Sequence, residues 1–336
     1  MTRALPSGGE VAAAAGALQA FRDLRAQLET LVIGQQTLVE RLLIALLAGG
    51  HVLVEGAPGL AKTRAIKALA AGLEADFHRV QFTPDLLPAD LTGSDVFRPE
   101  DGSFRFQAGP IFHNLLLADE INRAPAKVQS ALLEAMGEGQ VTVGAKSYAL
   151  PRLFLVMATQ NPIEQEGTYP LPEAQLDRFL FHVRVDYPAP AASREILRLV
   201  RAEALAPTSA RSAGATLLAQ AQVFAARDAV LRLHLAEPVE DYIVALVEAS
   251  RAPAAYGAEL ADWVRWGASP RGAIGLESAA RAHAWLAGRD FVTPEDVQVI
   301  APDILRHRIL LEYEAEAEGI TPQRFVEELL ARVPAP

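Results

Sequence analysis

Residues 56–63 read Gly-Ala-Pro-Gly-Leu-Ala-Lys-Thr, a run of small residues that ends in an amine and a hydroxyl side chain. A loop that wraps a phosphate needs inward-facing backbone N–H groups and therefore small residues. Lys62 would neutralise the β- and γ-phosphates of a nucleotide, and the Thr63 hydroxyl would complete a Mg²⁺ coordination sphere. We therefore expect the chain to bind ATP and Mg²⁺, with nucleotide contacts from Gly56, Ala57, Pro58, Gly59, Leu60, Ala61, Lys62, Thr63 and Arg64.

One position departs from the usual phosphate-loop pattern, because Ala61 stands where the second glycine is expected. If this position requires a positive φ, alanine costs roughly 1 kcal/mol there.

Two adjacent carboxylates, Asp119 and Glu120, follow the apolar run Leu115–Ala118. Neighbouring strand residues point to opposite sides, so the two carboxylates can take different roles. Asp119 would hold Mg²⁺ through its water shell, and Glu120 would polarise the attacking water. The alternative is that the pair only starts a solvent-facing turn.

A third polar position, Asn161, ends the apolar segment Met157-Ala158-Thr159-Gln160. Ligands gather at the carboxyl ends of parallel strands, where an amide could orient the lytic water or contact the γ-phosphate. The simpler alternative is an Asn-Pro turn.

Short apolar runs alternate with helical stretches in the first half of the chain, which predicts a parallel sheet with helical crossovers. The expected strands are 51–54, 78–82, 114–118, 153–158 and 180–185, and the expected helices are 17–31, 36–47, 62–73, 125–137 and 172–178. Two hairpins interrupt the alternation, one centred on residues 99–102 and one over 140–150.

Strand signals nearly vanish beyond Pro188 and Pro190, where we expect helices over 193–206, 214–226, 238–251, 272–288, 294–302 and 321–332. Thr-Pro pairs at 293–294 and 321–322 mark two helix starts. The predicted fold is an α/β protein with an αβα core over residues 17–188 and a helical domain over 189–336, preceded by a disordered tail over 1–16.

The composition narrows the class of protein. The chain of 336 residues contains no cysteine, which excludes disulfides and thiolate metal sites and indicates a cytoplasmic protein. No stretch of the sequence has 18 consecutive apolar residues, so we expect no transmembrane span. The net charge of −10 argues against a broad nucleic-acid-binding surface.

Taken in order, these motifs resemble the MoxR family of AAA+ ATPases over roughly residues 31–310. The resemblance extends to the amino-acid sequence of several stretches: Gln81–Pro88, Asp119–Lys127, Leu171–Phe179 and Gly267–Arg271. The Gly-Leu-Ala-Lys-Thr form of the phosphate loop, with its Ala61, is also usual in that family.

The resemblance implies further site residues. Arg178 occupies the arginine-finger position, from which it would reach the γ-phosphate in a neighbouring subunit; the alternative is a surface ion pair with Asp177 or Glu173. Arg271 occupies the sensor-2 position, acting in its own subunit or across an interface, unless it is only a solvent-exposed arginine at a helix start. Ile33 and Gly34 resemble the segment that lies against adenine; the alternative is an ordinary glycine-centred loop before a helix.

The resemblance also implies partners. The chain would form a homo-oligomeric ring, a hexamer, with its two hairpins facing a central pore. Lys146 and Arg152 could contact a substrate there, although solvated hairpin charges explain them more simply. Arg123 and Lys127 could sense the neighbouring subunit. A von Willebrand factor A domain protein and a client enzyme complex would be the partners in assembly, activation or cofactor insertion.

Two other functions stay open at this point. Related AAA+ branches with the same insertions include DNA helicases, so a nucleic-acid-stimulated motor is one alternative. A nucleotide-gated scaffold with little hydrolysis is the other.

Overall fold

A computed structural model of the chain describes residues 8–162, 167–205 and 216–336. Within these ranges no helix has both the length and the apolar character needed to cross a lipid bilayer. Helix α1 (Gly8–Leu31) begins earlier than expected. The predicted disordered tail is therefore wrong for residues 8–16, and residues 1–7 lie outside the described part of the chain.

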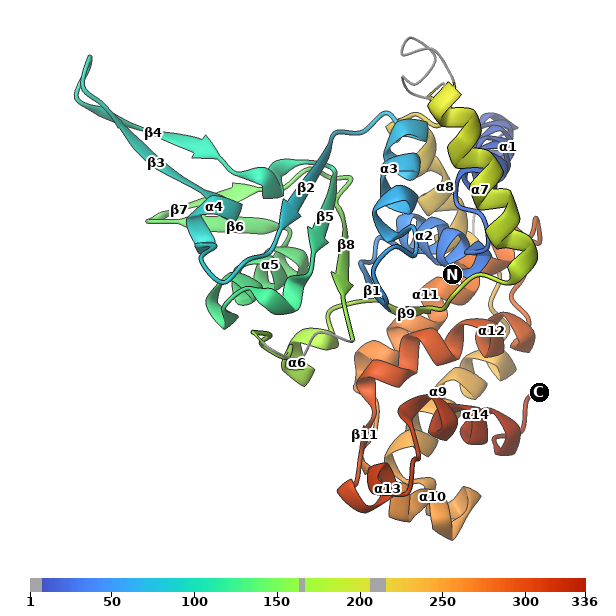
Figure 1. Cartoon of the computed structure of the whole chain (residues 1–336). Helices are drawn as coiled ribbons and strands as arrows, with labels where there is room; N and C mark the ends of the chain where they lie inside the picture. Colours follow the sequence, from blue (N-terminus) through green and yellow to red (C-terminus); the bar gives the residue numbers. More distant parts are fainter. Residues whose placement is uncertain (1–7, 163–166, 206–215) are drawn as a thin grey trace.

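A five-stranded parallel sheet forms the centre of the N-terminal half (Figure 1), as the alternating pattern predicts. Its spatial order is β2-β5-β8-β1-β9, so the strands that carry the phosphate loop and Asn161 are neighbours. The strands are β1 (Val52–Gly56), β2 (Phe77–Gln81), β5 (Leu115–Asp119), β8 (Leu155–Gln160) and β9 (Phe181–Val185).

Alternation along the strands supplies two hydrophobic cores, one on each face of the sheet. In β1, Val52 and Val54 belong to the core that helices α1, 36–48 and 62–72 cover, whereas Leu53 belongs to the core under helix 126–138. Both faces of the three central strands, β5, β8 and β1, are buried, which explains why these strands read as nearly continuous apolar runs. These helices are α2 (Gln36–Ala48), α3 (Lys62–Gly72) and α5 (Ala126–Glu138), with the short helix α4 (Pro88–Thr92) beside α5.

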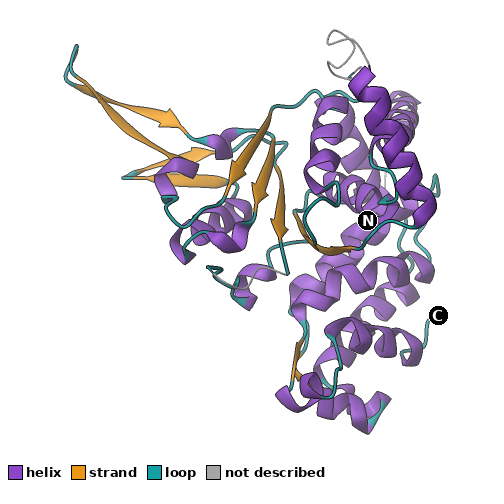
Figure 2. Cartoon of the chain, viewed as in Figure 1, coloured by secondary structure: helices purple, strands orange, loops and turns teal. Residues whose placement is uncertain are grey.

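Two hairpins extend from the sheet, and both are confirmed predictions. β3 (Gly93–Arg98) pairs with β4 (Ser103–Ala108) around the expected turn, and this hairpin stands out from the molecule in Figure 2. β6 (Gln140–Val143) pairs with β7 (Lys146–Ala149). The short helix α6 (Glu173–Leu176) precedes β9.

The C-terminal half is mostly helical, as expected, but a two-stranded antiparallel ribbon of β10 (Val264–Trp266) and β11 (Leu310–Leu311) interrupts it. Thr293 and Thr321 are the N-caps of the helices that begin at Pro294 and Pro322, which confirms both predicted helix starts. The helices are α7 (Pro190–Leu205), α8 (Gln220–Arg232), α9 (Glu237–Arg251), α10 (Ala258–Trp263), α11 (Pro270–Leu286), α12 (Pro294–Leu305), α13 (Tyr313–Ala317) and α14 (Pro322–Arg332).

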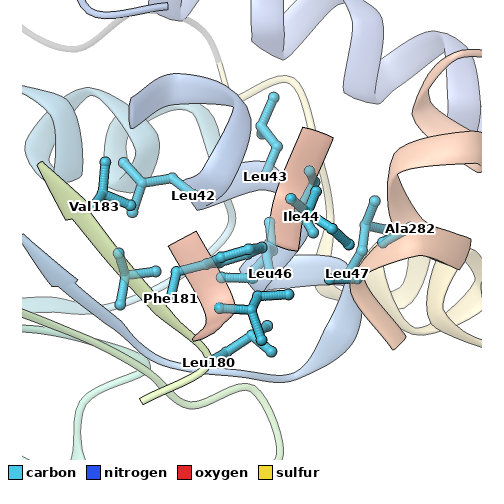
Figure 3. Packing of buried hydrophobic residues seen from close by; sticks show 14 of the residues in the cluster. Leu42, Leu43, Ile44, Leu46, Leu47, Leu180, Phe181, Val183 and Ala282 are labelled. Carbon is cyan, nitrogen blue, oxygen red and sulfur yellow. The ribbon is translucent and has the colours of Figure 1, made fainter. Parts of the chain in front are cut away.

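Helix α2 joins the two halves, because it is buried between the sheet and the C-terminal helices. Figure 3 shows Leu42 beside Val183 of β9, and Leu47 beside Ala282 of α11. One hydrophobic core therefore runs across the boundary predicted at residue 188. Strands β1 and β9 therefore share one hydrophobic core with the helices of the C-terminal half.

Candidate nucleotide-binding site

The phosphate loop connects β1 to α3, and its geometry explains its residue types. A Cβ on Gly56 would lie 2.6 Å from the carbonyl oxygen of Val185, so only glycine fits at that position. Gly59 has φ +83°. Ala61 has φ 59° and ψ 14°, so the departure from the glycine pattern is a left-handed alanine. Alanine is sterically disfavoured in this conformation.

The Lys62 ammonium lies inside the loop. Its Nζ donates to the carbonyl oxygen of Gly56 at 2.6 Å and to that of Gln160 at 3.3 Å. These contacts tie the loop to the end of the neighbouring strand β8 and hold the positive charge close to where a phosphate would be cradled.

A cavity of about 370 Å³ opens in front of the loop. It gathers the polar side chains that the sequence predicted on three separate segments. Its lining consists of Pro58, Gly59, Leu60, Ala61, Lys62, Thr63, Arg64, Asp119, Glu120, Thr159 and Asn161. The Thr63 hydroxyl and the Asp119 carboxylate both border this space, and hard oxygen donors of this kind fit Mg²⁺.

Both oxygens of Asp119 have protein partners. Thr159 Oγ1 donates to Oδ1 at 2.6 Å, and the Arg79 guanidinium donates to Oδ2 at 2.6 and 3.0 Å. Thr159 also accepts the backbone N–H of Glu120 at 2.9 Å. The sequence reasoning missed Thr159 and Arg79, although Thr159 lies inside the apolar segment that led to Asn161.

Glu120 has an unusual backbone, with φ 57° and ψ 51°. This left-handed conformation turns the chain sharply after β5 and places Glu120 on the cavity wall. Gln81 Nε2 donates to its Oε2 at 2.8 Å, and Arg123 Nε lies 3.2 Å from the same oxygen. Arg123 therefore pairs with Glu120 of its own chain.

A smaller, mostly apolar cavity of about 70 Å³ adjoins the loop. Ile33 lines this cavity, and Gly34 (φ +79°) packs against Pro188 outside the lining. The remaining lining residues are Leu31, Gln35, Gly59, Leu60, Ala61, Arg64, Pro188, Ile196, Leu199 and Val200. The contribution of α7 was not expected from the sequence.

Arg64 lines both cavities, and two other segments of the chain fix its guanidinium. Its Nε donates to the carbonyl oxygen of Leu31 at 2.6 Å, and its guanidinium pairs with Glu203 of α7. It therefore ties the phosphate-loop helix to the helix that covers the apolar cavity.

Arg178 and Arg271 are absent from the described lining of both cavities. Arg178 donates to the carbonyl oxygen of Leu133 on α5. Arg271 is half exposed and lies 3.5 Å from Asp177 Oδ2. The contact of Arg178 is therefore with a backbone carbonyl oxygen, and not the surface ion pair with Asp177 or Glu173 considered above.

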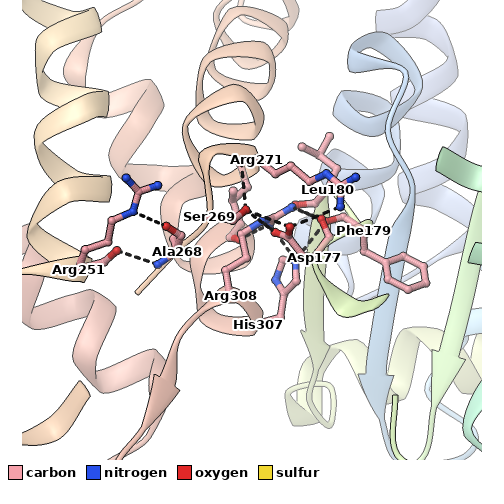
Figure 4. A network of polar contacts seen from close by, with 11 residues as sticks. Asp177, Phe179, Leu180, Arg251, Ala268, Ser269, Arg271, His307 and Arg308 are labelled. Carbon is pink, nitrogen blue, oxygen red and sulfur yellow. Dashed lines mark hydrogen bonds and ion pairs between the residues drawn. The ribbon is translucent and has the colours of Figure 1, made fainter. Parts of the chain in front are cut away.

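Asp177 is the centre of a polar network that joins the core to the helical half (Figure 4). Arg308 Nε donates to Asp177 Oδ1 at 2.9 Å, and Ser269 Oγ lies 2.9 Å from both carboxylate oxygens. Burial lowers the pKa of Arg308 to about 10 even though Asp177 opposes the shift. Burial and the adjacent Arg308 charge also hold the pKa of His307 well below its usual range.

The hairpin charges are placed differently from one another. The Arg152 guanidinium lies 4.5 Å from the centroid of the Phe224 ring on α8, so it packs against its own chain. Lys146 is exposed at the start of β7. The substrate contact suggested for Arg152 is therefore disfavoured by this packing.

Comparisons with known proteins agree with this geometry. Residues 51–181 match the family described as "ATPase family associated with various cellular activities (AAA)", and residues 260–329 match the AAA lid domain. Chaperone MoxR1 of Mycobacterium tuberculosis is 46% identical, covering 92% of this chain and 81% of that protein. YeaC of Bacillus subtilis is 44% identical, with 91% of each chain covered. A crystal structure of a Cytophaga hutchinsonii protein assigned as an ATPase superimposes with a TM-score of 0.88 at 44% identity, covering 96% of this chain and 97% of its own.

Proposed function

The chain belongs to the MoxR family of AAA+ ATPases, and from this premise we propose that it hydrolyses ATP to ADP and phosphate with Mg²⁺. The observation that carries the proposal is the 370 Å³ cavity, which brings Lys62, Thr63, Asp119, Glu120 and Asn161 to one space. These are the groups that phosphoryl transfer to water requires: a cation, metal ligands, a base and a polar orienting group.

Each side chain then has a defined task. Lys62, already directed into the loop by Gly56 and Gln160, neutralises the phosphates. Thr63 and Asp119 hold Mg²⁺, which when bound offsets the phosphate charge. Glu120 accepts the proton of the attacking water, and Asn161 orients that water or the γ-phosphate. Ile33, Gly34 and the apolar residues of α7 enclose the adenine.

The same site is completed by a second copy of the chain. Arg178 follows Asp177 in the sequence and Arg271 lies 3.5 Å from its Oδ2, and neither arginine lines the two cavities of its own chain. A fixed guanidinium fork supplied by a neighbour suits the charge that develops on phosphoryl oxygens. This arrangement supports a homo-oligomeric ring, proposed to be a hexamer, with both arginines acting across the interface.

Its work is proposed to be chaperone-like remodelling in the cytoplasm. The relative named Chaperone MoxR1 supports this class of function. A protein with a von Willebrand factor A domain and a client enzyme complex are the proposed partners. The step served would be assembly, activation or insertion of a metal or cofactor.

The proposal is tested with the purified full chain by following phosphate release from ATP with and without Mg²⁺. We expect Mg²⁺-dependent release that Lys62→Ala abolishes together with ATP binding. Nucleotide binding without release in the parent chain, alone and with partners, would instead identify a nucleotide-gated scaffold. A higher rate on adding single-stranded DNA at low salt would identify a nucleic-acid motor.

A further inference from the structure

Arg79 lies outside the cavity lining yet contacts the proposed metal-holding carboxylate. It is on β2, the edge strand beside β5, where Arg79 is in register with Leu117 and Gln81 with Asp119. Residues two apart in a strand share a face, so Arg79 and Gln81 both face the side of the sheet that carries Asp119. Arg79 makes two donations to Oδ2 of that carboxylate.

The same guanidinium also reaches Glu120 through one intermediate side chain. Arg79 Nη2 donates to Gln81 Oε1 at 3.0 Å, and Gln81 Nε2 donates to Glu120 Oε2 at 2.8 Å. Because an amide has a fixed donor and acceptor end, Arg79 sets which way Gln81 faces. One arginine therefore orients both carboxylates.

We propose that Arg79 is a positioning residue that supplies the positive charge beside Asp119 before Mg²⁺ binds, so that Mg²⁺ must compete with it. This inference rests on the proposed function and deepens it. Thr159 holds the other oxygen, Oδ1, at 2.6 Å, so the carboxylate stays fixed on both sides while its charge is shared.

The competition follows from simple electrostatics. A guanidinium beside the carboxylate lowers the attraction that Asp119 offers to a divalent cation. The Arg79 side chain is 46% exposed and that of Asp119 is 13% exposed, so solvent screens part of the effect. A change of roughly threefold in the contribution of Mg²⁺ to nucleotide binding is the scale expected for a pair of this exposure.

The experiment compares the parent chain with Arg79→Met, Arg79→Lys and Arg184→Met. Arg184 is a matched control, because its side chain is also 46% exposed and it lies 3.9 Å from a carboxylate, Glu55, at the end of another strand of the sheet. For each chain, the affinity for a fluorescent, non-hydrolysable ATP analogue is measured in excess Mg²⁺ and in EDTA. The ratio of the two affinities reports the coupling between metal and nucleotide without relying on activity.

We expect the ratio to rise about threefold in Arg79→Met and to stay at the parent value in Arg79→Lys and Arg184→Met. An unchanged or smaller ratio in Arg79→Met overturns the inference, even if the variant is less stable to heat. If the parent chain binds the analogue under neither condition, the proposed function itself fails. These two failures are therefore distinguishable.

Discussion

Ala61 and Glu120 both have a left-handed backbone, with φ of 59° and 57°, and both line the 370 Å³ cavity. Among the described residues other than glycine, they alone have positive φ. Such conformations cost of order 1–3 kcal/mol for each residue and concentrate at functional sites. Both of these strained positions therefore lie in the lining of the proposed nucleotide-binding site.

A branched side chain at position 61 tests the importance of this backbone. Ala61→Val should destabilise the chain by about 2 kcal/mol and weaken ATP binding, because a β-branched residue resists positive φ. Ala61→Gly should stay within about 1 kcal/mol of the parent, since glycine accepts this conformation. Urea unfolding and calorimetric ATP titration measure both effects. Equal stability of the valine and glycine variants would show that the loop relaxes to another conformation.

Replacing the proposed base separates binding from turnover. Glu120→Gln keeps the shape of the side chain but loses the carboxylate, so ATP binding should persist while phosphate release falls at least about 100-fold. Glu134→Gln, an exposed change on α5, should leave both unchanged. Persistent release in the Glu120 variant would mean that another group is the base.

The link between the core and the helical half should depend on Asp177. Asp177→Ala leaves Arg308, whose side chain is 3% exposed, without its carboxylate, and the expected loss of stability is about 3 kcal/mol. Glu248→Ala removes an exposed partner of Arg251 and should cost less than about 1 kcal/mol. Chemical unfolding of the two variants makes the comparison, and equal losses would contradict the structural role of the network.

Acid should destabilise the fold through His51. Burial lowers the pKa of His51 from 6.5 to about 4, and its Nδ1 accepts the N–H of Val156 at 3.1 Å. Between pH 6.5 and pH 4, His51 is protonated in the unfolded chain but neutral in the folded chain. The free energy of unfolding is therefore highest above pH 6.5 and falls as the pH drops toward 4.

Between pH 7.5 and pH 5 this one group should remove about 2 kcal/mol of the free energy of unfolding. His51→Gln should show a correspondingly smaller loss, although not none, because the pKa of His307 is lowered in the same direction. Urea unfolding at the two pH values measures the difference. The same loss in parent and variant would show that His51 does not carry it.

The sequence predicted the parts of the site that are local. Three features could be predicted because each lies within one strand and the turn that follows it. They are the small residues of the phosphate loop, the acidic pair after β5 and the polar end of β8. The fold class could be predicted because short apolar runs alternate with helical stretches. A parallel sheet with helices on both faces produces this pattern.

Other contacts were not predictable because they depend on register and packing between distant segments. Arg79 and Gln81 became visible only when β2 was paired with β5. Arg152 could be placed against Phe224 only once α8 was positioned. The α7 residues of the apolar cavity belong to a helix that the sequence assigned simply to the C-terminal half.

The central claim is that each ATP site is shared between two copies of the chain, and mixing two inactive variants tests it most directly. Arg178→Ala and Glu120→Gln should each abolish phosphate release. An equal mixture in a ring should recover about one quarter of the parent rate, because about one interface in four joins an intact Glu120 to an intact Arg178. Differently tagged subunits confirm that the variants co-assemble. Co-assembly without recovery of phosphate release would contradict the shared site.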